Sequence, residues 1–346
     1  MRRLAVLVIV LVLMVPLVSA TPYWFKEGIY AKYISRGQML TIETNTSDGY
    51  ITYACQGIEL TWRVLKVTGD RAQMSVLLRG FNCTKSVQKT LDEETAREIL
   101  RRYQEKYNFT GGECLEISSQ LKNVTICENS YSEVGVSGRI GLTIEEGVGH
   151  LFNESLIPET PSWGNAFELD LKTGDIYVNG SPVGKNFLWT ENPANITGLE
   201  ILPGLQVENV KMINSTALTY YGDFNAPVYM AHTNMMKGAS GFGKCVLLYD
   251  GSSGLAIAFF TPFSPLWKVL GISEAMIQDT ELAREHEEEI KESNKMPPFG
   301  LVLAETNIDF TKPAELPEEG PSKTAIIAVV GIVAVLGALF LWRWRR

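Results

Sequence analysis

The segment Leu60–Leu78 constrains the fold more than any other part of this chain. Two runs of alternating apolar and polar residues flank Thr68–Asp70, whose Gly-Asp pair is typical of a tight turn between strands. A slip of one residue would move Trp62 to the face that carries Arg63, so the apolar pattern selects a single antiparallel register. In that register the numbers of opposite residues sum to 138, and the pairs are Leu60 with Leu78, Trp62 with Val76, Val64 with Met74 and, on the other face, Arg63 with Ser75.

Two more hairpins show the same pattern of short apolar runs around turn residues. They are Phe167–Leu171 with Ile176–Val178 around the turn Lys172–Asp175, and Val246–Tyr249 with Leu255–Phe260 around the turn Asp250–Gly254. Leu301–Phe310 has the composition of a last strand. The sequence therefore predicts a mainly β (α+β) fold, built as a twisted antiparallel sheet or a half-barrel.

One or two helices are expected to pack on this sheet. Thr90–Glu93 fits a capping box, and Gly111–Gly112 ends the apolar helical stripe that follows it. Ser264–Pro265 begins a short helical turn, and Ser273–Ser293 is predicted to be a second helix, charged enough to lie on the surface. The stripe of the first helix consists of Ala96, Ile99, Leu100, Tyr103 and Tyr107.

Both ends of the chain carry membrane signals. Residues 1–20 combine two Arg, an apolar run and a small-residue exit, which is the pattern of a signal peptide cleaved after Ala20. Ala325–Trp342 contains eighteen residues without a charge, a length that spans about 27 Å as a helix. Because Lys and Arg stay on the cytoplasmic side, we expect a single-pass protein of the cell membrane. Its parts would be an extracytoplasmic domain (21–310), a Pro- and Glu-rich stalk (311–324), a transmembrane helix (325–342) and a basic cytoplasmic tail (343–346).

The expected external part is acidic. Without the five Arg of the two ends, the chain has 26 basic and 39 acidic residues, a net charge of −13. Such a surface repels nucleic acid, so we expect no nucleic-acid partner. The partners that the sequence allows are the membrane, through Ala325–Trp342, and a surface protein or an apolar small molecule.

Five cysteines in an exported domain are expected to form disulfides. Four cysteines allow three pairings, and the hairpin register favours one of them, because Cys55 and Cys83 also sum to 138. A bulge at Gly57 would spoil this match. Cys114 and Cys127 bracket a second hairpin, so we expect the bridges Cys55–Cys83 and Cys114–Cys127.

Eight N-x-[ST] sequons all lie in the part expected to be external, and none follows residue 216. Such sequons accept glycans on surface turns of exported proteins. We therefore expect glycosylation at several of Asn45, Asn82, Asn108, Asn123, Asn153, Asn179, Asn195 and Asn214.

The stretch Gly238–Cys245, GASGFGKC, differs by one residue from a phosphate-binding loop. A true loop opens a helix whose N-terminus holds the phosphates, but here Val246–Tyr249 runs directly into the next turn. Cys245 also stands where a Ser or Thr would bind magnesium. We therefore expect no nucleotide binding, a loop over Gly238–Lys244, and a strand over Cys245–Tyr249 in which Cys245 is a buried thiol.

One cluster could bind a soft metal ion. Met230, His232, Met235 and Met236 supply thioether and imidazole groups, which suit Cu(I). Met more commonly fills a core, and the cluster is not repeated along the chain. The sequence therefore predicts no cofactor, with these four residues as the candidate ligands if a metal is bound.

No catalytic set of residues is evident. His150, His232 and His286 lie outside any H-E-x-x-H motif, and the sequence has no G-x-S-x-G elbow. The pair Glu145–Glu146 would suit a glycosidase only if a second carboxylate lay roughly 5–10 Å away. The sequence therefore predicts no catalytic residues.

Four phrases resemble those of uncharacterised single-pass surface proteins of Thermococcus-like hyperthermophilic archaea. They are Lys26–Tyr33, Thr61–Val67, Phe167–Gly174 and Tyr249–Leu255. The resemblance implies a β-rich ectodomain, with a half-barrel and helices on one side, similar to lipoprotein-carrier folds. It implies no catalytic residues.

Together these features favour a non-enzymatic surface protein with a binding or envelope-structural role. One alternative is a lipid or small apolar ligand bound in the concave face of an open β-sheet. Another alternative is an extracellular hydrolase, which would need carboxylates or a Ser/His pair clustered in a cleft.

Overall fold

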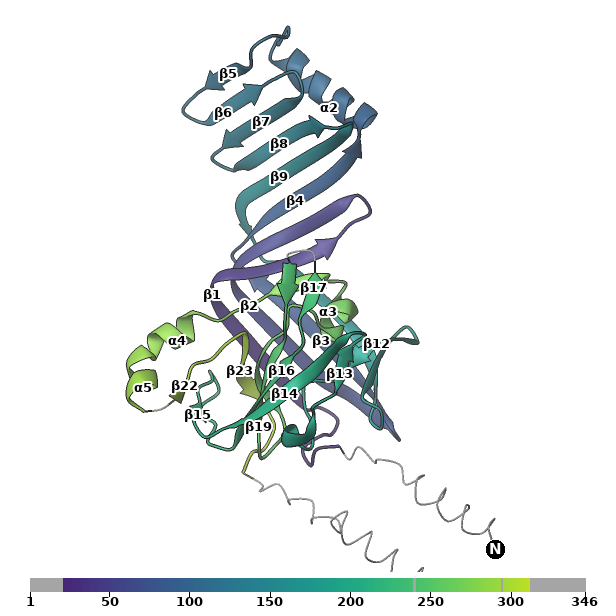
Figure 1. The fold of residues 1–346 in the computed structure, drawn as a ribbon, viewed down its shortest axis with the longest axis vertical. Helices are drawn as coiled ribbons and strands as arrows, with labels where there is room; N and C mark the ends of the chain where they lie inside the picture. The colour runs from purple at the N-terminus through teal and green to yellow at the C-terminus, as the bar shows by residue number, and fades with distance from the viewer. Residues whose placement is uncertain (1–20, 239–240, 294, 312–346) are drawn as a thin grey trace, which may run out of the picture. The chain divides into compact units, whose positions relative to one another are not determined.

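The computed structural model describes residues 21–238, 241–293 and 295–311 (Figure 1). The chain divides into two units, Met1–Ile308 and Asp309–Arg346. Of the second unit only residues 309–311 are described, and the expected signal peptide, transmembrane helix and tail lie outside the described residues, as does the stalk beyond residue 311. Within the described part of the chain, no helix is both long and apolar enough to cross a membrane.

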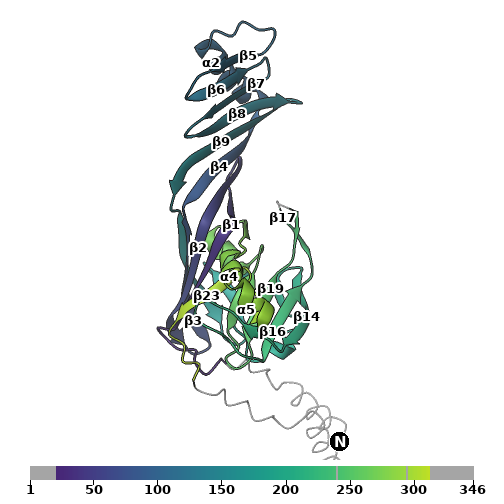
Figure 2. The ribbon, with the colours of Figure 1, turned by 90° about the vertical axis from the view of Figure 1, so that its left-hand side faces the viewer.

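The first unit is mainly β, as the sequence predicts, and its large sheet consists of antiparallel pairs. The strands around its main core are β1 (Tyr30–Asn45), β2 (Gly49–Thr68), β3 (Arg71–Phe81), β10 (Ser162–Asp170), β11 (Asp175–Val178), β12 (Ser181–Lys185), β13 (Glu200–Leu202), β14 (Leu205–Ile213), β16 (Val228–Thr233), β19 (Val246–Asp250), β20 (Ala256–Phe260) and β23 (Leu301–Thr306). One series of pairs runs β3–β10–β11–β12, and another runs β13–β14–β16–β19–β20–β23–β1–β2–β3. The two series meet where a Cβ on Gly184 would come within 2.6 Å of the carbonyl oxygen of Ile201, so the strands enclose one interior (Figure 2).

Large side chains fill this interior. The hydroxyl of Tyr33 donates to the carbonyl of Ala256 at 2.8 Å, and the hydroxyl of Tyr249 donates to the carbonyl of Phe187 at 2.8 Å. Both tyrosines are fully buried, and this burial raises the pKa of each hydroxyl far above its ordinary value. The fully buried large side chains of the unit include Tyr33, Leu60, Trp62, Met74, Phe187, Tyr249 and Phe259.

The predicted register of the long hairpin is confirmed. Trp62 lies opposite Val76, and a bulge after Val64 shifts only the pairs next to the turn. Beyond Gly57 the partner of β2 becomes β4 (Cys83–Asp92). The numbers of opposite residues still sum to 138 along this second partner, from Ala54 with Thr84 to Gly49 with Lys89. A single strand therefore belongs both to the main core and to the strands that continue from β4.

Those strands form a ladder that Figure 1 shows at the top. β4 pairs with β9 (Val148–Glu159), and the ladder continues through β8 (Gly138–Glu145), β7 (Ser130–Gly135), β6 (Lys122–Ile126) and β5 (Leu115–Ser118). The helix α2 (Glu93–Lys106) packs on one face of this ladder. Its Ala96 and Leu100 are buried against Val124, Ile126, Tyr131, Leu142 and Ile144, while Tyr103 stacks on Tyr131 with ring centroids 3.8 Å apart.

The predicted stripe of α2 is confirmed, but both of its ends were predicted wrongly. Asp92, and not Thr90, caps the helix, because the Oδ1 atom of Asp92 accepts from the amide of Thr95 at 2.8 Å. Thr90 is still part of β4, opposite His150. At the other end the helix stops at Lys106, before the predicted stop at Gly111–Gly112.

The second predicted helix is largely wrong. Ser273–Ser293 contains β21 (Glu274–Met276), which pairs with β1, and then two short helices, α4 (Glu281–Glu285) and α5 (Glu287–Glu292). The helical stripe fails because Met276 belongs to a strand, where backbone bonds to β1 replace helical ones. The short helix α3 (Pro265–Leu270) is confirmed and is capped by Ser264, whereas the last strand ends at Thr306 instead of Phe310.

The remaining elements are short. The strands β15 (Thr216–Ala217) and β22 (Lys295–Met296) form a small parallel pair, and Pro193–Asn195 forms the 3-10 turn η1. The ends of the first unit meet at Asn307: its side-chain amide donates to the carbonyl of Gly28, and its carbonyl oxygen accepts from the amide of Tyr30, each at 3.0 Å.

Candidate functional site

The stretch Gly238–Cys245 is part of a small hairpin that projects beside β16 and β19 (Figure 2). β17 (Met236–Gly238) pairs with β18 (Gly241–Gly243), so that Lys237 lies opposite Phe242. The sequence predicted a simple loop here, which is corrected to this hairpin. The strand predicted to follow is confirmed, since β19 begins at Val246 and pairs with β20.

Two glycines of the motif allow close packing. A Cβ on Gly238 would lie 2.3 Å from Cε1 of Phe263 and 2.7 Å from Oε2 of Glu274, and one on Gly243 would lie 3.3 Å from Cε2 of Phe263. The Sγ atom of Cys245 donates to the carbonyl of Phe263 at 3.3 Å, and burial raises the pKa of the Cys245 thiol to about 12. The glycines therefore seat the hairpin on Phe263, and Cys245 is the buried thiol that the sequence predicts.

The outer face of the sheet beside this hairpin carries a row of cross-strand neighbours. Asn209 of β14 lies opposite His232 of β16, His232 lies opposite Val246 of β19, and Val246 lies opposite Phe260 of β20. Side chains directly opposite each other on one face of an antiparallel sheet are in contact range. This row is the floor of a surface groove of about 670 Å³, which we call the His232 groove.

The walls of the His232 groove come from the hairpin and from β21. Met235, Phe242 and Lys244 line one side, and Met276 of β21 also lines the groove. Phe242 is 71% exposed and Met235 is 62% exposed, so both apolar side chains stand largely in solvent. The groove therefore combines exposed apolar walls with a polar floor.

The electrostatics of the groove centre on His232. Its Nδ1 atom is buried and has no hydrogen-bond partner among the described residues. Burial lowers the pKa of the His232 imidazole below its ordinary value, and the charges of Lys244 and Lys211 lower it further. His232 is thus neutral at pH 7, and Lys211 and Lys244 supply the positive charge of the groove, with Glu208 as an acidic residue in its lining.

The structure brings together only part of the predicted metal cluster. His232 and Met235 line the same groove, whereas Met230 lies opposite Lys211 in the next row and Met236 pairs with Gly243. The sequence analysis did not include Met276, because its approach to the groove depends on the distant pairing of β21 with β1. Among the described residues no group of three or more His, Cys, Asp or Glu could hold a metal ion.

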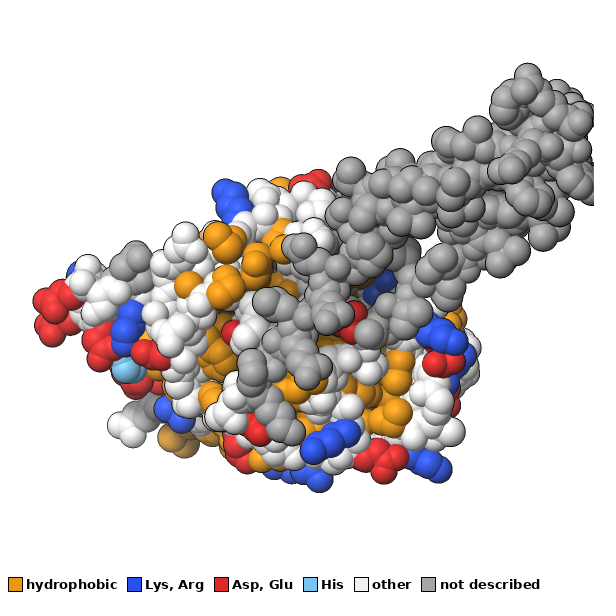
Figure 3. Space-filling model, turned by 90° about the horizontal axis from the view of Figure 1, so that it is seen from below, with side chains coloured by type: hydrophobic (Ala, Val, Ile, Leu, Met, Phe, Trp, Pro, Cys, Tyr) orange, Lys and Arg blue, Asp and Glu red, His pale blue; other side chains and the backbone are white. Residues whose placement is uncertain are grey.

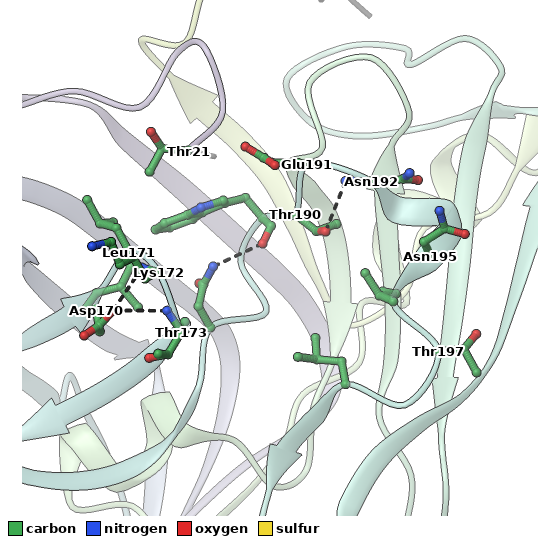
Figure 4. Close-up of a pocket in the computed structure, with 16 residues that line it drawn as sticks. Thr21, Asp170, Leu171, Lys172, Thr173, Thr190, Glu191, Asn192, Asn195 and Thr197 are labelled. Carbon is green, nitrogen blue, oxygen red and sulfur yellow. Dashed lines mark hydrogen bonds between the residues drawn. The ribbon is translucent and has the colours of Figure 1, made fainter. Parts of the chain in front are cut away.

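A second pocket, of about 430 Å³, lies at the β10–β11 turn (Figure 4). The carboxylate of Asp170 accepts from the amides of Lys172 and Thr173, and Asn186 donates to the carbonyl of Trp189. The ring of Trp189 packs against Trp24, Phe25 and Trp62. The polar groups named here satisfy the fold itself, so the pocket is explained as the cover of an aromatic cluster.

Both predicted disulfides are formed. Cys55 is bonded to Cys83 and Cys114 is bonded to Cys127, and the predicted register holds across Gly57. The asparagines of the sequons lie at or near the surface: Asn108 is half-buried, and the exposed ones are Asn45, Asn82, Asn123, Asn153, Asn179, Asn195 and Asn214. Asn82, Asn108 and Asn179 have positive φ angles of 50–55°, which also gives each a role in its turn.

The candidate catalytic residues lie on separate elements. His150 is on β9 opposite Thr143, His232 is on β16, and His286 joins α4 to α5 with its Nδ1 atom 3.5 Å from Glu289. The pair Glu145–Glu146 is exposed at the β8–β9 turn. None of these pairings resembles a nucleophile with its base.

Comparison of the chain with protein families, with curated proteins and with solved structures finds no match. The geometry of the molecule is therefore the basis for the proposals below.

Proposed function

We propose that this protein is an exported, membrane-anchored surface protein whose first unit carries a binding surface. The observation that carries the proposal is the formation of two disulfides from four of its five cysteines. Disulfides form and persist mainly in oxidising compartments outside the cytosol. The exposed sequon asparagines and the expected signal peptide and membrane segment support the same location.

The arrangement of the chain ends suits anchoring. Asn307 bonds Gly28 and Tyr30, so the segment that leads to the expected stalk leaves the unit beside its N-terminal end. The ladder β4–β9 grows from the opposite end of β2, since Gly49 pairs with β4 and Thr68 pairs with β3. Figure 3 shows the lower face of the molecule, where hydrophobic side chains lie among charged ones. An anchor on this side would leave the ladder and the His232 groove free to meet partners.

The two alternatives have less support. A half-barrel that holds a lipid in its concave face would need an empty interior, and here Trp62, Tyr33 and Phe259 occupy the enclosed core. A hydrolase would need a catalytic pair, and the three described histidines lie on separate elements. A binding role is the function that the exposed groove supports best.

The test is protease treatment of intact cells that express the full chain with a tag after Arg346. We expect added protease to remove the first unit and leave the tag protected, and to remove both in lysed cells. Hyperthermophilic archaea also form disulfides inside their cells, so accessibility, rather than oxidation, decides the location. A first unit that survives in intact cells and is cut only after lysis would overturn the proposal.

A further inference from the structure

The lysines around the His232 groove differ from most of the other lysines in the structure. Lys211, Lys237 and Lys244 have no ion-pair, hydrogen-bond or aromatic partner among the described residues. Many other lysines have one: those in ion pairs are Lys32, Lys89, Lys122, Lys172, Lys185, Lys291 and Lys295. Three unneutralised cations thus lie at or near one groove on a chain whose expected external part carries a charge of −13.

The apolar side chains of the groove are equally unpartnered. Phe242 and Met235 are more exposed than buried, and Met276 is 37% exposed. Because Lys237 lies directly opposite Phe242 in the hairpin, a cation stands beside the most exposed aromatic ring. Met adapts its shape to varied apolar partners, and an exposed aromatic ring is a common anchor at interfaces.

The positions of the charges indicate the kind of ligand. Lys211 is on β14, Lys237 is on β17, and Lys244 follows β18, so the cations stand on three different elements. A single anionic head group would meet one or two of these positions, whereas a chain with several carboxylates can meet all three. Such complementarity gives specificity and a fast, salt-dependent association.

We propose that the His232 groove binds an extended acidic segment of a protein partner, with an apolar side chain of that segment seated against Phe242 and Met235. Carboxylates on either side of the apolar residue would pair with Lys211, Lys237 and Lys244. The neutral His232 on the floor offers a hydrogen-bonding nitrogen to the same segment. The inference rests on the proposed function only in placing the groove where an external partner can reach it.

The experiment uses the full-length protein in phosphatidylcholine nanodiscs and the fluorescein-labelled peptide GEELEEG as the probe, with anisotropy as the readout. We expect saturable binding that weakens as salt is raised from 50 to 500 mM, because the contacts are charge pairs. The charge-reversed peptide GKKLKKG and the peptide GEESEEG, which lacks the apolar residue, should bind much more weakly. Equal binding of all three peptides would contradict the proposal.

Variants locate the site. The double variant Lys211→Glu/Lys244→Glu should weaken GEELEEG binding on the order of tenfold, and Phe242→Ser should weaken it about fivefold. The matched controls are Lys66→Glu, an exposed lysine on β2, and Leu121→Ser, whose side chain is 70% exposed in the ladder; both should bind as the parent does. Thermal unfolding of each variant checks that its fold is kept.

A second readout follows the floor of the groove. Diethyl pyrocarbonate modifies exposed imidazoles, and bound peptide should slow its reaction at His232 but not at His150 or His286. Binding that ignores both groove variants, or binding of anionic phosphatidylglycerol vesicles through Phe242 without any binding of GEELEEG, would overturn the proposal. Failure of the protease test with intact binding would remove only the proposed location, so the two failures are distinguishable.

Discussion

The side chain of Asn307 bonds both the carbonyl of Gly28 and the amide of Tyr30, although 279 and 277 residues separate them in sequence. Each bond is 3.0 Å long. The hydroxyl of Thr306 adds a bond of 2.6 Å to the carbonyl of Tyr30. These contacts fasten the last strand of the unit to the first.

Replacement of Asn307 by Ala should destabilise the first unit by about 1–2 kcal/mol, because two hydrogen bonds are lost and each is worth roughly 0.5–1.5 kcal/mol. Chemical denaturation measures this difference. Asn192→Ala is the control, since the side chain of this exposed asparagine makes no hydrogen bond among the described residues. An equal loss in both variants would show that the contact between the ends contributes nothing specific.

Gly80 and the disulfide Cys55–Cys83 should be strongly coupled. A Cβ on Gly80 would lie 2.5 Å from Sγ of Cys83 and 2.8 Å from Sγ of Cys55. Gly80→Ala should therefore cost about 1–3 kcal/mol in the parent, as overpacking of a core does, and much less in a Cys55→Ala/Cys83→Ala background. A double-mutant cycle from urea denaturation measures the coupling, and additive effects would contradict it.

The carboxyl of Glu43 should make stability depend on pH. Burial raises its pKa, and Glu274, directly opposite on β21, raises it further. A raised pKa in the folded state means that the stability held with Glu43 protonated is lost as pH rises through the folded pKa. Glu43→Gln should therefore be more stable than the parent at pH 7, with the difference vanishing below the ordinary carboxyl pKa.

The control for this pH dependence is Glu116→Gln, because Glu116 is exposed on β5 and forms no ion pair among the described residues. Its unfolding free energy should follow the parent at every pH between 3 and 8. The same pH profile in both variants would show that the pairing of Glu43 with Glu274 is not the cause.

Asp92 should matter to α2 more than Thr90 does. Asp92 caps the helix through the amide and hydroxyl of Thr95, and these bonds lower the pKa of the Asp92 carboxyl. A lowered folded pKa contributes stability above the ordinary pKa that is lost as pH falls through the folded value. Asp92→Ala should lower the melting temperature at pH 7 more than Thr90→Ala does, and the opposite order would restore the capping box predicted from the sequence.

The native protein should present no reactive thiol. Cys245 is buried with its pKa raised to about 12, and the other four cysteines are paired. Maleimide at pH 7 should add nothing to the folded chain and one group per chain after unfolding without reductant, as intact mass shows. Two or more additions without reductant would mean that a disulfide is absent.

The parts of the fold that depend on neighbouring residues could be predicted. Trp62 pairs with Val76 across a short turn, so alternation alone defined this register and with it the bridge Cys55–Cys83. The capping error at Thr90 has a local cause too, because Asp92 two residues later is an equally good cap.

The parts that depend on distant pairings could not be predicted. Glu274 belongs to a charged run that favours a helix, and only its partner Glu43, 231 positions earlier, makes it a strand. The His232 groove has the same origin, since Lys211, His232 and Met276 come from three strands whose pairing order no local pattern shows. The sequence contained the basic and apolar residues of the site, but not their proximity.

The constant register of β2 has a mechanical consequence. Since Gly49–Thr68 pairs with β4 at one end and β3 at the other, the ladder cannot swing as a body on a flexible hinge. A force that pulls β5 away from Ile308 would run along this shared strand, and the covalent bridge Cys55–Cys83 crosses it at the change of partner. The molecule would therefore transmit tension as a stiff rod would, and it should yield in the main core or in the outer ladder before it parts at their junction.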